Sequence, residues 1–467
     1  METLPSSNYP LPSVASLQLQ YIGKSLLNVP TPAVVIDRAV VKRNSIAMLQ
    51  VCSKLGVNFR AHVKSHKTLE LAKIQVGNDM KAPADFVVST LVEAENLLPF
   101  MLECVAIGRP CSILYGVPIS QSCLPRLFRL ASLLPSSATN IIIDNFTAFH
   151  HYTAQYHTFA QTLSAKNLAA KEIGTFIKID TGYNRAGIKA TSPAFSDLVK
   201  TVTDSGSFKG FYSHYGHSYA GSSEEEAATG LIEELRGLEE ACSLSTLSPS
   251  TSICLSVGAT PTATAAQNMF LSTSPKVAEF NEILARLKKS YKVEFHAGVY
   301  PLLDMQQVAT KARPSANAGK QSGFEPLSKS NIGIKVLVEV TSIYTERSKP
   351  ELLISAGSLA LGREPCKSYP GWGVVSPELG NAKGIVYDEG GEKQGWIVGR
   401  ISQEHGILTW EGESRGINEL GIGTKLLVWP NHACVAGAGF GWYLVVDSDV
   451  EGHAYDVVDV WVRWRGW

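Results

Sequence analysis

The sequence lacks three features that would assign it to a class of protein at once. Its 42 Lys and Arg residues balance its 42 Asp and Glu residues, so the net charge favours neither nucleic acid nor an anionic membrane as a partner. No apolar run reaches the roughly 20 residues that a membrane-spanning helix needs. The first residues also lack the basic and apolar segments of a secretory signal. We therefore expect a cytoplasmic globular protein.

The eight cysteines are scattered along the chain and form no C-x-x-C pair. Several lie in apolar runs such as "SICLSV" and "MLECVAI". This pattern is typical of reduced, mostly buried thiols and not of a disulfide framework. Hydrophobic residues make up 45% of the sequence, which is enough for large buried cores.

Short β-rich runs recur along the first two thirds of the chain, and helix-like stretches separate them. Eight such runs begin at residues 57, 85, 112, 140, 175, 210, 252 and 293. Eight strand–helix units of this size predict an α/β fold, a (β/α)8 TIM-like barrel over residues 38–310. The alternative is an open doubly wound sheet, but no strand is followed by the G-x-G-x-x-G turn that would favour it.

The composition changes after the polar segment 312–331, which we interpret as a linker or an insertion. Closely spaced β-like runs with little helix follow it, from "IGIKVLVEV" to "VVDVWVRW". This pattern predicts a C-terminal all-β domain over residues 331–467. The early run "TPAVVID" at 31–37 fits either domain, and we expect residues 20–37 to join the C-terminal one.

The stretch "FRAHVKSHKTLE", residues 59–70, places two lysines and two histidines within six positions at the end of the first predicted strand. Active sites of such barrels lie at the carboxyl ends of the strands. A lysine there can form an imine with an aldehyde, and such lysines are activated when burial or nearby cations lower their pKa. Lys64 is the candidate amine, and His66 and Lys67 are the candidate cations. The alternative is a solvated surface charge, because lysine is seldom buried.

Polar residues follow three more predicted strands. "KIDTGYNRAGI" (178–188) ends the fifth strand and "SHYGHSYAG" (213–221) ends the sixth. After the seventh strand, in "SVGATPT" (256–262), Gly258 lets the backbone approach a ligand, and the amides around Ala259 and Thr260 can hold a phosphate. Taken alone, each of these segments is more often a structural turn than a binding site. An amine, a phosphate nest and an arginine at one end of a barrel together predict pyridoxal 5′-phosphate (PLP) as the cofactor.

Six motifs together resemble the eukaryotic D-serine dehydratase family: "TPAVVID", "FRAHVKSHKT", "DTGYNRAGI", "HYGHSY", "SVGATPT" and "WPNHAC". This family belongs to the alanine-racemase-like enzymes that use PLP (fold type III), and D-threonine aldolase is a close relative. The resemblance runs from about residue 30 to the C-terminus. It implies a PLP-binding barrel completed by a β-domain, in a homodimer, and it implies that Lys64 rather than Lys67 forms the imine.

The resemblance also suggests the other contacts of the cofactor. Tyr183 or Arg185 faces the pyridine nitrogen. The candidates for holding the phosphate are Tyr219, Gly258, Ala259 and Thr260. "GVYPLLD" (298–304) resembles a "GTY…D" stretch of the family, with Val299 in place of threonine. The remaining candidate contacts of substrate or cofactor are His66, Tyr300 and Asp304.

"WPNHACVAG", residues 429–437, places His432 and Cys434 two positions apart, on one face of a strand-like segment. Imidazole and thiolate suit Zn2+. Two ligands are too few for a structural zinc site, so the residues alone favour a buried cysteine beside an ordinary histidine. The resemblance implies a zinc pair instead, with positions open for water or substrate. D-Threonine aldolases carry aspartate where this chain has Cys434, which favours the dehydratase.

The predicted reaction is the conversion of D-serine to pyruvate and ammonia, with D-threonine as a further candidate substrate. Lys64 removes the Cα proton as general base, and Zn2+ at His432 and Cys434 assists loss of the β-hydroxyl. The alternatives are a D-threonine aldolase or related D-3-hydroxy amino acid aldolase, an amino-acid racemase, and a non-catalytic PLP-homeostasis protein. Proteins of the last kind are small barrels without a second domain, so residues 331–467 count against it.

Overall fold

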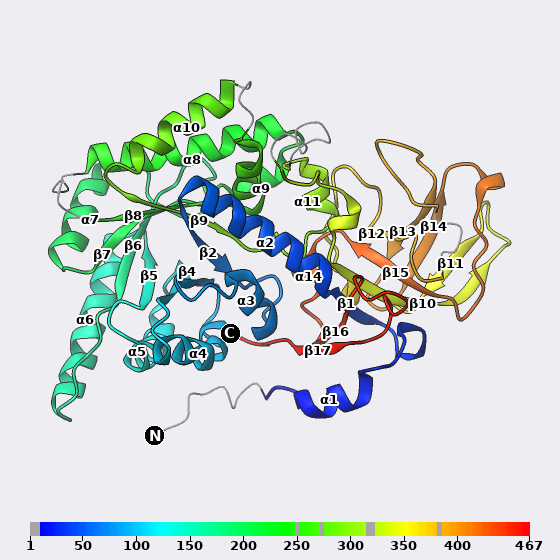
Figure 1. The fold of residues 1–467 in the computed structure, drawn as a ribbon, viewed down its shortest axis with the longest axis horizontal. Coiled ribbons are helices and arrows are strands. Elements are labelled where there is room, and N and C mark those ends of the chain that lie inside the picture. The colour runs from blue at the N-terminus through cyan, green and yellow to red at the C-terminus, as the bar shows by residue number, and fades with distance from the viewer. Residues whose placement is uncertain (1–9, 246, 248–251, 271–274, 314–322, 381–384) are drawn as a thin grey trace.

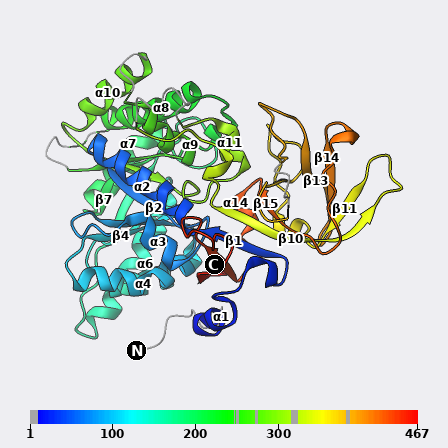
Figure 2. The ribbon, with the colours of Figure 1, turned by 45° about the vertical axis from the view of Figure 1, so that its right-hand side comes forward.

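The chain folds into an eight-stranded parallel barrel and a nine-stranded, mostly antiparallel sheet, which lie side by side (Figure 1; Figure 2). The computed structural model describes residues 10–245, 247, 252–270, 275–313, 323–380 and 385–467. The predicted (β/α)8 barrel with a C-terminal β-domain is confirmed. Residues 314–322, which form much of the predicted linker or insertion at 312–331, lie outside the described residues.

The barrel strands close in chain order, from β2 round to β9. They are short and mostly buried, and every residue of β3, β5 and β6 is buried, as expected of parallel strands covered by helices. The strands are β2 (Asn58–His62), β3 (Ala84–Val88), β4 (Cys111–Pro118), β5 (Thr139–Ile143), β6 (Gly174–Lys178), β7 (Phe208–Tyr212), β8 (Cys254–Val257) and β9 (Lys292–Ala297).

Long helices cover the outside of the barrel (Figure 1). The first of them, α2, begins where Asp37 Oδ1 accepts the amides of Ala39 and Val40. It ends at Gly56, whose φ of 61° lies in the left-handed region that glycine adopts easily. The helices are α2 (Arg38–Leu55), α3 (Leu69–Val76), α4 (Leu91–Ala106), α5 (Leu124–Leu133), α6 (Phe146–Ser164), α7 (Pro193–Asp204), α8 (Glu224–Leu244) and α10 (Pro275–Leu287).

Side chains alternate along each barrel strand, so Arg60 and His62 turn toward the barrel axis while Phe59 packs outward. Inside the barrel, Arg60 Nε donates to Glu294 Oε1 at 2.8 Å. A separate inner cluster of apolar side chains comprises Leu114, Ile142, Phe176 and Tyr212. The interior is therefore a packed core and not a pore, which leaves the strand ends for ligands.

The second domain is a sheet in the order β11-β14-β13-β12-β15-β10-β1-β16-β17. β1 (Ala33–Asp37), the early run that fits either domain by sequence, lies in this sheet, antiparallel to β10 and parallel to β16. The other strands are β10 (Ile334–Tyr344), β11 (Glu351–Ile354), β12 (Gly373–Val375), β13 (Gly395–Ile401), β14 (Gly406–Glu411), β15 (Lys425–Pro430), β16 (Trp442–Val446) and β17 (Asp459–Val462).

Several short helices complete the fold. They are α1 (Val14–Tyr21), which packs beside β17, and η4 (Gly216–Ala220), α9 (Thr260–Ala265), α11 (Met305–Thr310), α13 (Ser358–Leu361) and α14 (Ala433–Ala436). No helix in the described ranges is long and apolar enough to cross a membrane. All eight cysteines, each of which lies in a described segment, are unpaired.

Beyond β17 the chain returns to the barrel. The Trp464 amide donates to the Lys67 carbonyl oxygen at 2.8 Å, and its side chain is buried in the hydrophobic core of the barrel. Arg126 Nη1 donates to the Trp467 carbonyl oxygen at 2.8 Å. In Figure 1 the red C-terminal segment ends beside α4. The last residues therefore fasten the second domain to the segment that carries Lys64.

We expect Trp464→Ala to lower the free energy of unfolding by about 3 kcal/mol or more, because it leaves a cavity in the barrel core. Urea denaturation followed by fluorescence measures this. Trp467→Ala is the matched control, since the Trp467 side chain is 78% exposed, and its effect should stay within about 0.5 kcal/mol. Equal effects of the two substitutions would contradict the proposed anchoring.

Candidate active site

Lys64 lies just beyond β2, at the carboxyl end of the barrel. It continues the inward-facing side of the strand, after Arg60 and His62, and it is half-buried. No hydrogen bond or ion pair of its amine is found within the described part of the chain. A partly buried amine without a partner at this end of a barrel is available to react with a ligand.

The buried histidines His62 and His296 and the half-buried His214 lie close enough to this amine to be affected by its charge. Burial lowers the pKa of each well below its usual range, and the positive charge of Lys64 contributes in all three cases. The ring centres of His214 and His296 lie 5.9 Å apart, and Tyr212 stacks on His296 at 4.1 Å. The imidazoles are therefore neutral, so they can form hydrogen bonds without adding charge.

Some ring nitrogens of these histidines form hydrogen bonds within the protein, and at least one does not. His214 Nδ1 lies 2.8 Å from the Gly258 carbonyl oxygen, which only accepts, so Nδ1 carries the proton. His296 Nδ1 lies 3.0 Å from Ser256 Oγ, and its Nε2 is buried with no partner among the residues that the structure describes. An unsatisfied buried nitrogen beside a partnerless amine fits a site that a polar ligand completes.

His66 and Lys67 do not act as the free cations expected beside Lys64. His66 is fully buried, with its Nε2 2.9 Å from Gln75 Oε1, and burial lowers the pKa of His66 to about 3. It is neutral, so the expectation that it supplies a charge is wrong. Lys67 Nζ forms a buried ion pair with Glu93 Oε1 at 2.9 Å. Lys67 is thus less available for chemistry than Lys64.

Lys178 is a buried cation that the sequence reasoning did not single out. It is the last residue of β6, and its Nζ lies 5.0 Å from the centre of the Tyr212 ring inside the barrel. Burial, with the charge of Arg185, lowers the pKa of Lys178 to about 8, although nearby carboxylates oppose the shift. Side chains alternate between the two faces of a strand, so in "TFIKID" Phe176 and Lys178 lie on the same face. This alternation is the sequence signal that could have identified Lys178 as a residue of the barrel interior.

Arg185 and Tyr183, the two candidates for the pyridine nitrogen, lie in the loop after β6. The Arg185 guanidinium lies 5.1 Å from the Tyr183 ring centre, and its charge lowers the pKa values of His214 and Lys178 inside the barrel. The Tyr183 ring stacks on His217 at 5.7 Å. Of the two, Arg185 interacts electrostatically with the groups at the barrel mouth.

The turn after β8 holds Gly258, Ala259 and Thr260. Gly258 has a φ of 142°, and a Cβ there would lie 2.2 Å from the His296 carbonyl oxygen. Close packing against β9 therefore requires glycine. The Gly258 amide donates to Glu234 Oε1 at 3.1 Å, and the Ala259 amide donates to a threonine hydroxyl of α9 at 2.9 Å. Both amides have partners already.

Thr260 opens α9, where the first amides of a helix have no partner within the helix. Its hydroxyl accepts the Val299 amide at 3.1 Å. Burial raises the pKa of Tyr219, and so does the charge of Cys434, while hydrogen bonding to Thr260 opposes the shift. Tyr219 therefore connects the predicted phosphate turn with the predicted metal pair.

His432 and Cys434 lie at the start of α14, in the loop after β15. Burial alone would lower the pKa of His432, but hydrogen bonding to Cys434 and its charge, followed by the charge of Asp304, raise it to about 9. Imidazole and thiol are thus in contact. The described residues contain no group of three or more His, Cys, Asp or Glu that could hold a metal ion. The pair therefore fits an open zinc site and not a closed structural one.

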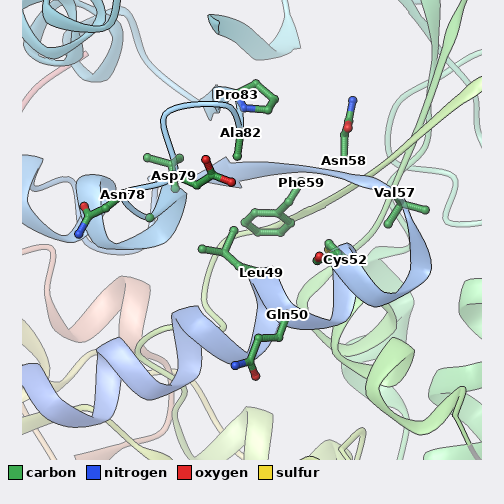
Figure 3. Close-up of a pocket in the computed structure, with 13 residues that line it drawn as sticks. Leu49, Gln50, Cys52, Val57, Asn58, Phe59, Asn78, Asp79, Ala82 and Pro83 are labelled. Atoms are coloured by element: carbon green, nitrogen blue, oxygen red, sulfur yellow. The ribbon is translucent and has the colours of Figure 1, made fainter. Parts of the chain in front are cut away.

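Tyr300 lies on the outward side of β2, away from Lys64. Its ring packs edge-on against Phe59, with ring centres 5.4 Å apart. A cavity of about 490 Å³ opens beside Phe59, between α2 and the end of α3. Figure 3 shows Leu49 of α2 turned toward Phe59 there. This cavity lies at the amino end of β2, opposite the end that carries Lys64, so it is not the candidate active site.

The comparison with known families first defines the class of protein. Residues 36–274 match the model described as "Alanine racemase, N-terminal domain", and residues 333–446 match the one described as "Putative serine dehydratase domain". The closed parallel barrel with an inward-facing lysine at its carboxyl end agrees with the first match. The protein is an alanine-racemase-like enzyme, a class of barrel that uses PLP.

The chain belongs to the D-serine dehydratase family. It is 37% identical to D-serine dehydratase of Schizosaccharomyces pombe, covering 97% of this chain and 95% of the relative. It is 32% identical to that of Saccharomyces cerevisiae, covering 96% and 99%. The solved structure of D-threo-3-hydroxyaspartate dehydratase from Delftia sp. HT23 is 26% identical, with a TM-score of 0.68 and coverage of 95% and 100%.

Two further solved structures, both of D-threo-3-hydroxyaspartate dehydratase, bear on the metal pair. One is a cysteine-to-alanine variant in the metal-free form, and the other is a histidine-to-alanine variant. In that enzyme the substituted histidine precedes the cysteine by two positions. His432 and Cys434 have the same order and spacing in this chain.

We expect Lys178→Met to stabilise the cofactor-free protein at pH 7 by about 3 kcal/mol at most, because it removes a buried cation. Since folding lowers the pKa of Lys178 from 10.5 to about 8, the unfolded chain binds the proton more readily between these values. The stability of the wild type should therefore rise as the pH rises from 8 to 10.5, and the variant should lack this increment. Thermal melts of both proteins across this pH range measure it, with exposed Lys200→Met as the control. A variant less stable than the wild type at pH 7 would contradict the assignment.

Proposed function

We propose that the protein is a PLP-dependent D-serine ammonia-lyase, which converts D-serine to pyruvate and ammonia. The observation that carries the proposal is the partnerless Lys64 amine at the barrel mouth, among neutral imidazoles. Membership of the D-serine dehydratase family supports the substrate, because two relatives that carry this name are 37% and 32% identical to the chain. The Delftia relative, which is named for D-threo-3-hydroxyaspartate, supports D-3-hydroxy amino acids as the wider substrate class.

The residues at the carboxyl end of the barrel fit PLP, since an amine, unsatisfied polar atoms and a helix start meet there. Arg185 is assigned to the pyridine nitrogen in preference to Tyr183, whose ring stacks on His217. When bound, PLP supplies an electron sink for the electron pair that proton removal leaves at Cα. The residues assigned to hold the cofactor are Lys64, Arg185, Tyr219 and Thr260, while Gly258 and Ala259, whose amides already have partners, shape the turn beside it.

Lys64 is the group best suited to move the Cα proton. Within the described segments no carboxylate pairs with its amine, so the amine is free to accept a proton from the substrate. His62 and His214 are neutral and can hold oxygen atoms by hydrogen bonds without competing for that proton. The chain thus separates the basic group from the groups that orient the ligand.

The His432–Cys434 pair fits Zn2+, which as a Lewis acid would assist departure of the β-hydroxyl. Nitrogen and sulfur donors are those that zinc prefers, and two protein ligands leave positions for a substrate oxygen. The metal-free form of the cysteine variant of D-threo-3-hydroxyaspartate dehydratase supports the assignment, because the substituted histidine and cysteine of that enzyme have the same His-x-Cys spacing. A homodimer, a cytoplasmic location and activity on D-threonine stay predictions.

Purified protein should release pyruvate and ammonia from D-serine and not from L-serine. Chelation should abolish this activity while the absorbance of bound PLP is kept, and added Zn2+ should restore it, because the metal acts only on the β-hydroxyl. His432→Ala and Cys434→Ala should each lower kcat/KM by about a hundredfold or more. Glycine in place of pyruvate, measured with D-threonine, would instead indicate an aldolase, and indifference to chelators would exclude the metal role.

Lys64→Ala should abolish covalent attachment of PLP and lower kcat/KM for D-serine by about a thousandfold or more, because the variant loses both the imine-forming and the basic group. Borohydride reduction followed by peptide mass spectrometry locates the cofactor. Lys67→Arg is the matched control, since it preserves a cation beside Glu93 and should retain the label. A label on Lys67 or Lys178 in the wild type would refute the assignment.

A further inference from the structure

The short helix that carries the metal pair begins in an unusual way. His432 occupies the N-cap position of α14, but its side chain makes no capping hydrogen bond. N-cap residues are normally Ser, Thr, Asp or Asn, whose side chains accept the amides of the first turn. An imidazole that is to bind a metal cannot serve in this way. The first turn of α14 therefore needs an acceptor from elsewhere.

Asp304 supplies that acceptor from the barrel side of the junction. Its Oδ2 accepts the amide of Ala433, the residue between His432 and Cys434, at 2.8 Å. Its Oδ1 accepts the Gln307 amide at 2.8 Å and so caps α11. The side chain is buried, with 1% of its surface exposed. One carboxylate thus holds two helix starts, one from each domain.

Neighbouring contacts fix the same turn. The Gln306 amide donates to the Asn431 carbonyl oxygen at 3.1 Å, and Gln306 Nε2 donates to the Pro365 carbonyl oxygen at 2.8 Å. Asn431 Nδ2 donates to the carbonyl oxygens of Glu364 and Gly371 at 3.0 and 2.9 Å. The backbone around the metal pair is therefore held on both sides, and Asp304 is the charged member of this set.

We propose that Asp304 is a positioning residue for the metal site, which orients His432 and Cys434 by capping α14 and places a carboxylate beside the pair that would bind the metal. The inference rests on the proposed metal role of the pair. Carboxylates in the outer shell of a metal site fix the ligands and raise their affinity for the metal, and their loss typically costs 10- to 100-fold in affinity. The charge of Asp304 already acts on His432 in the absence of metal.

Asp304→Ser separates the two roles of the carboxylate. Serine is a good N-cap, so the bond to the Gln307 amide is kept, but its short side chain cannot reach Ala433 as well. The dissociation constant for Zn2+, measured by competition with a chromophoric chelator, should rise 10- to 100-fold. Asp304→Asn, which keeps the volume and loses the charge, should show the same direction. The absorbance of bound PLP should be unchanged in both variants.

Asp37→Ser is the matched control. Asp37 is also a buried helix cap, which accepts the amides of Ala39 and Val40 and that of Ser448 in the second domain. Its variant should lower the melting temperature and leave zinc affinity within twofold of the wild type. If Asp304→Ser binds zinc as tightly as the wild type, the positioning role is overturned while the metal site stands. If wild-type protein binds no more zinc than His432→Ala, both proposals fall.

Discussion

The site depends on a group of positive charges at the barrel mouth, which the nearby carboxylates offset only in part. Lys64 has no ionic partner in the described chain, and Lys178 is buried against an aromatic ring with its pKa lowered to about 8. Arg185 adds a third charge that acts on the same region. Burying a cation such as Lys178 is unfavourable. An anion that binds there offsets the penalty and stabilises the folded state. A phosphate ester and the carboxylate of an amino acid are anions of this kind.

A second constraint is that the residues proposed for the chemistry are divided between two domains. These domains must keep a fixed position relative to each other. Two ion pairs, Arg38–Asp447 and Arg43–Asp449, cross the junction, and several other contacts there are directed to backbone atoms. Lys367 Nζ donates to the Ala220 carbonyl oxygen of η4 at 2.6 Å, and the Trp464 amide donates to the Lys67 carbonyl oxygen. Asp304 accepts the Ala433 amide. Backbone groups do not titrate in the physiological range, so the bond between the Trp464 amide and the Lys67 carbonyl oxygen keeps its strength when the pH changes.

The sequence predicted those features that a local pattern encodes. Eight apolar runs at regular spacing predicted the barrel, and the polar residues at strand ends predicted where Lys64 would lie. Strand pairing is not local, so the run at 31–37 fitted either domain until its neighbours β10 and β16 were known. Burial is not local either. His66 looked like a cation because the sequence does not reveal that Gln75 and the barrel wall enclose it. Lys178 was overlooked for the same reason.

The phosphate turn shows how one glycine can have two explanations. Gly258 was expected to let a ligand approach, yet glycine is required there because a Cβ would collide with the His296 carbonyl oxygen, and its amide already donates to Glu234.

Burial raises the pKa of Glu234 to about 7, against the hydrogen bonds that its carboxylate accepts. Near neutral pH this carboxyl is therefore protonated for part of the time. A protonated carboxyl repels a phosphate less than a carboxylate does, so the raised pKa is compatible with an anion at the start of α9. Pro261, in the first turn of α9, has no amide hydrogen, so the Tyr219 hydroxyl, which is affected by hydrogen bonding to Thr260 and by the charge of Cys434, is the donor best placed for that anion. Tyr219 thus joins the place where an anion would sit to the place where a metal would sit.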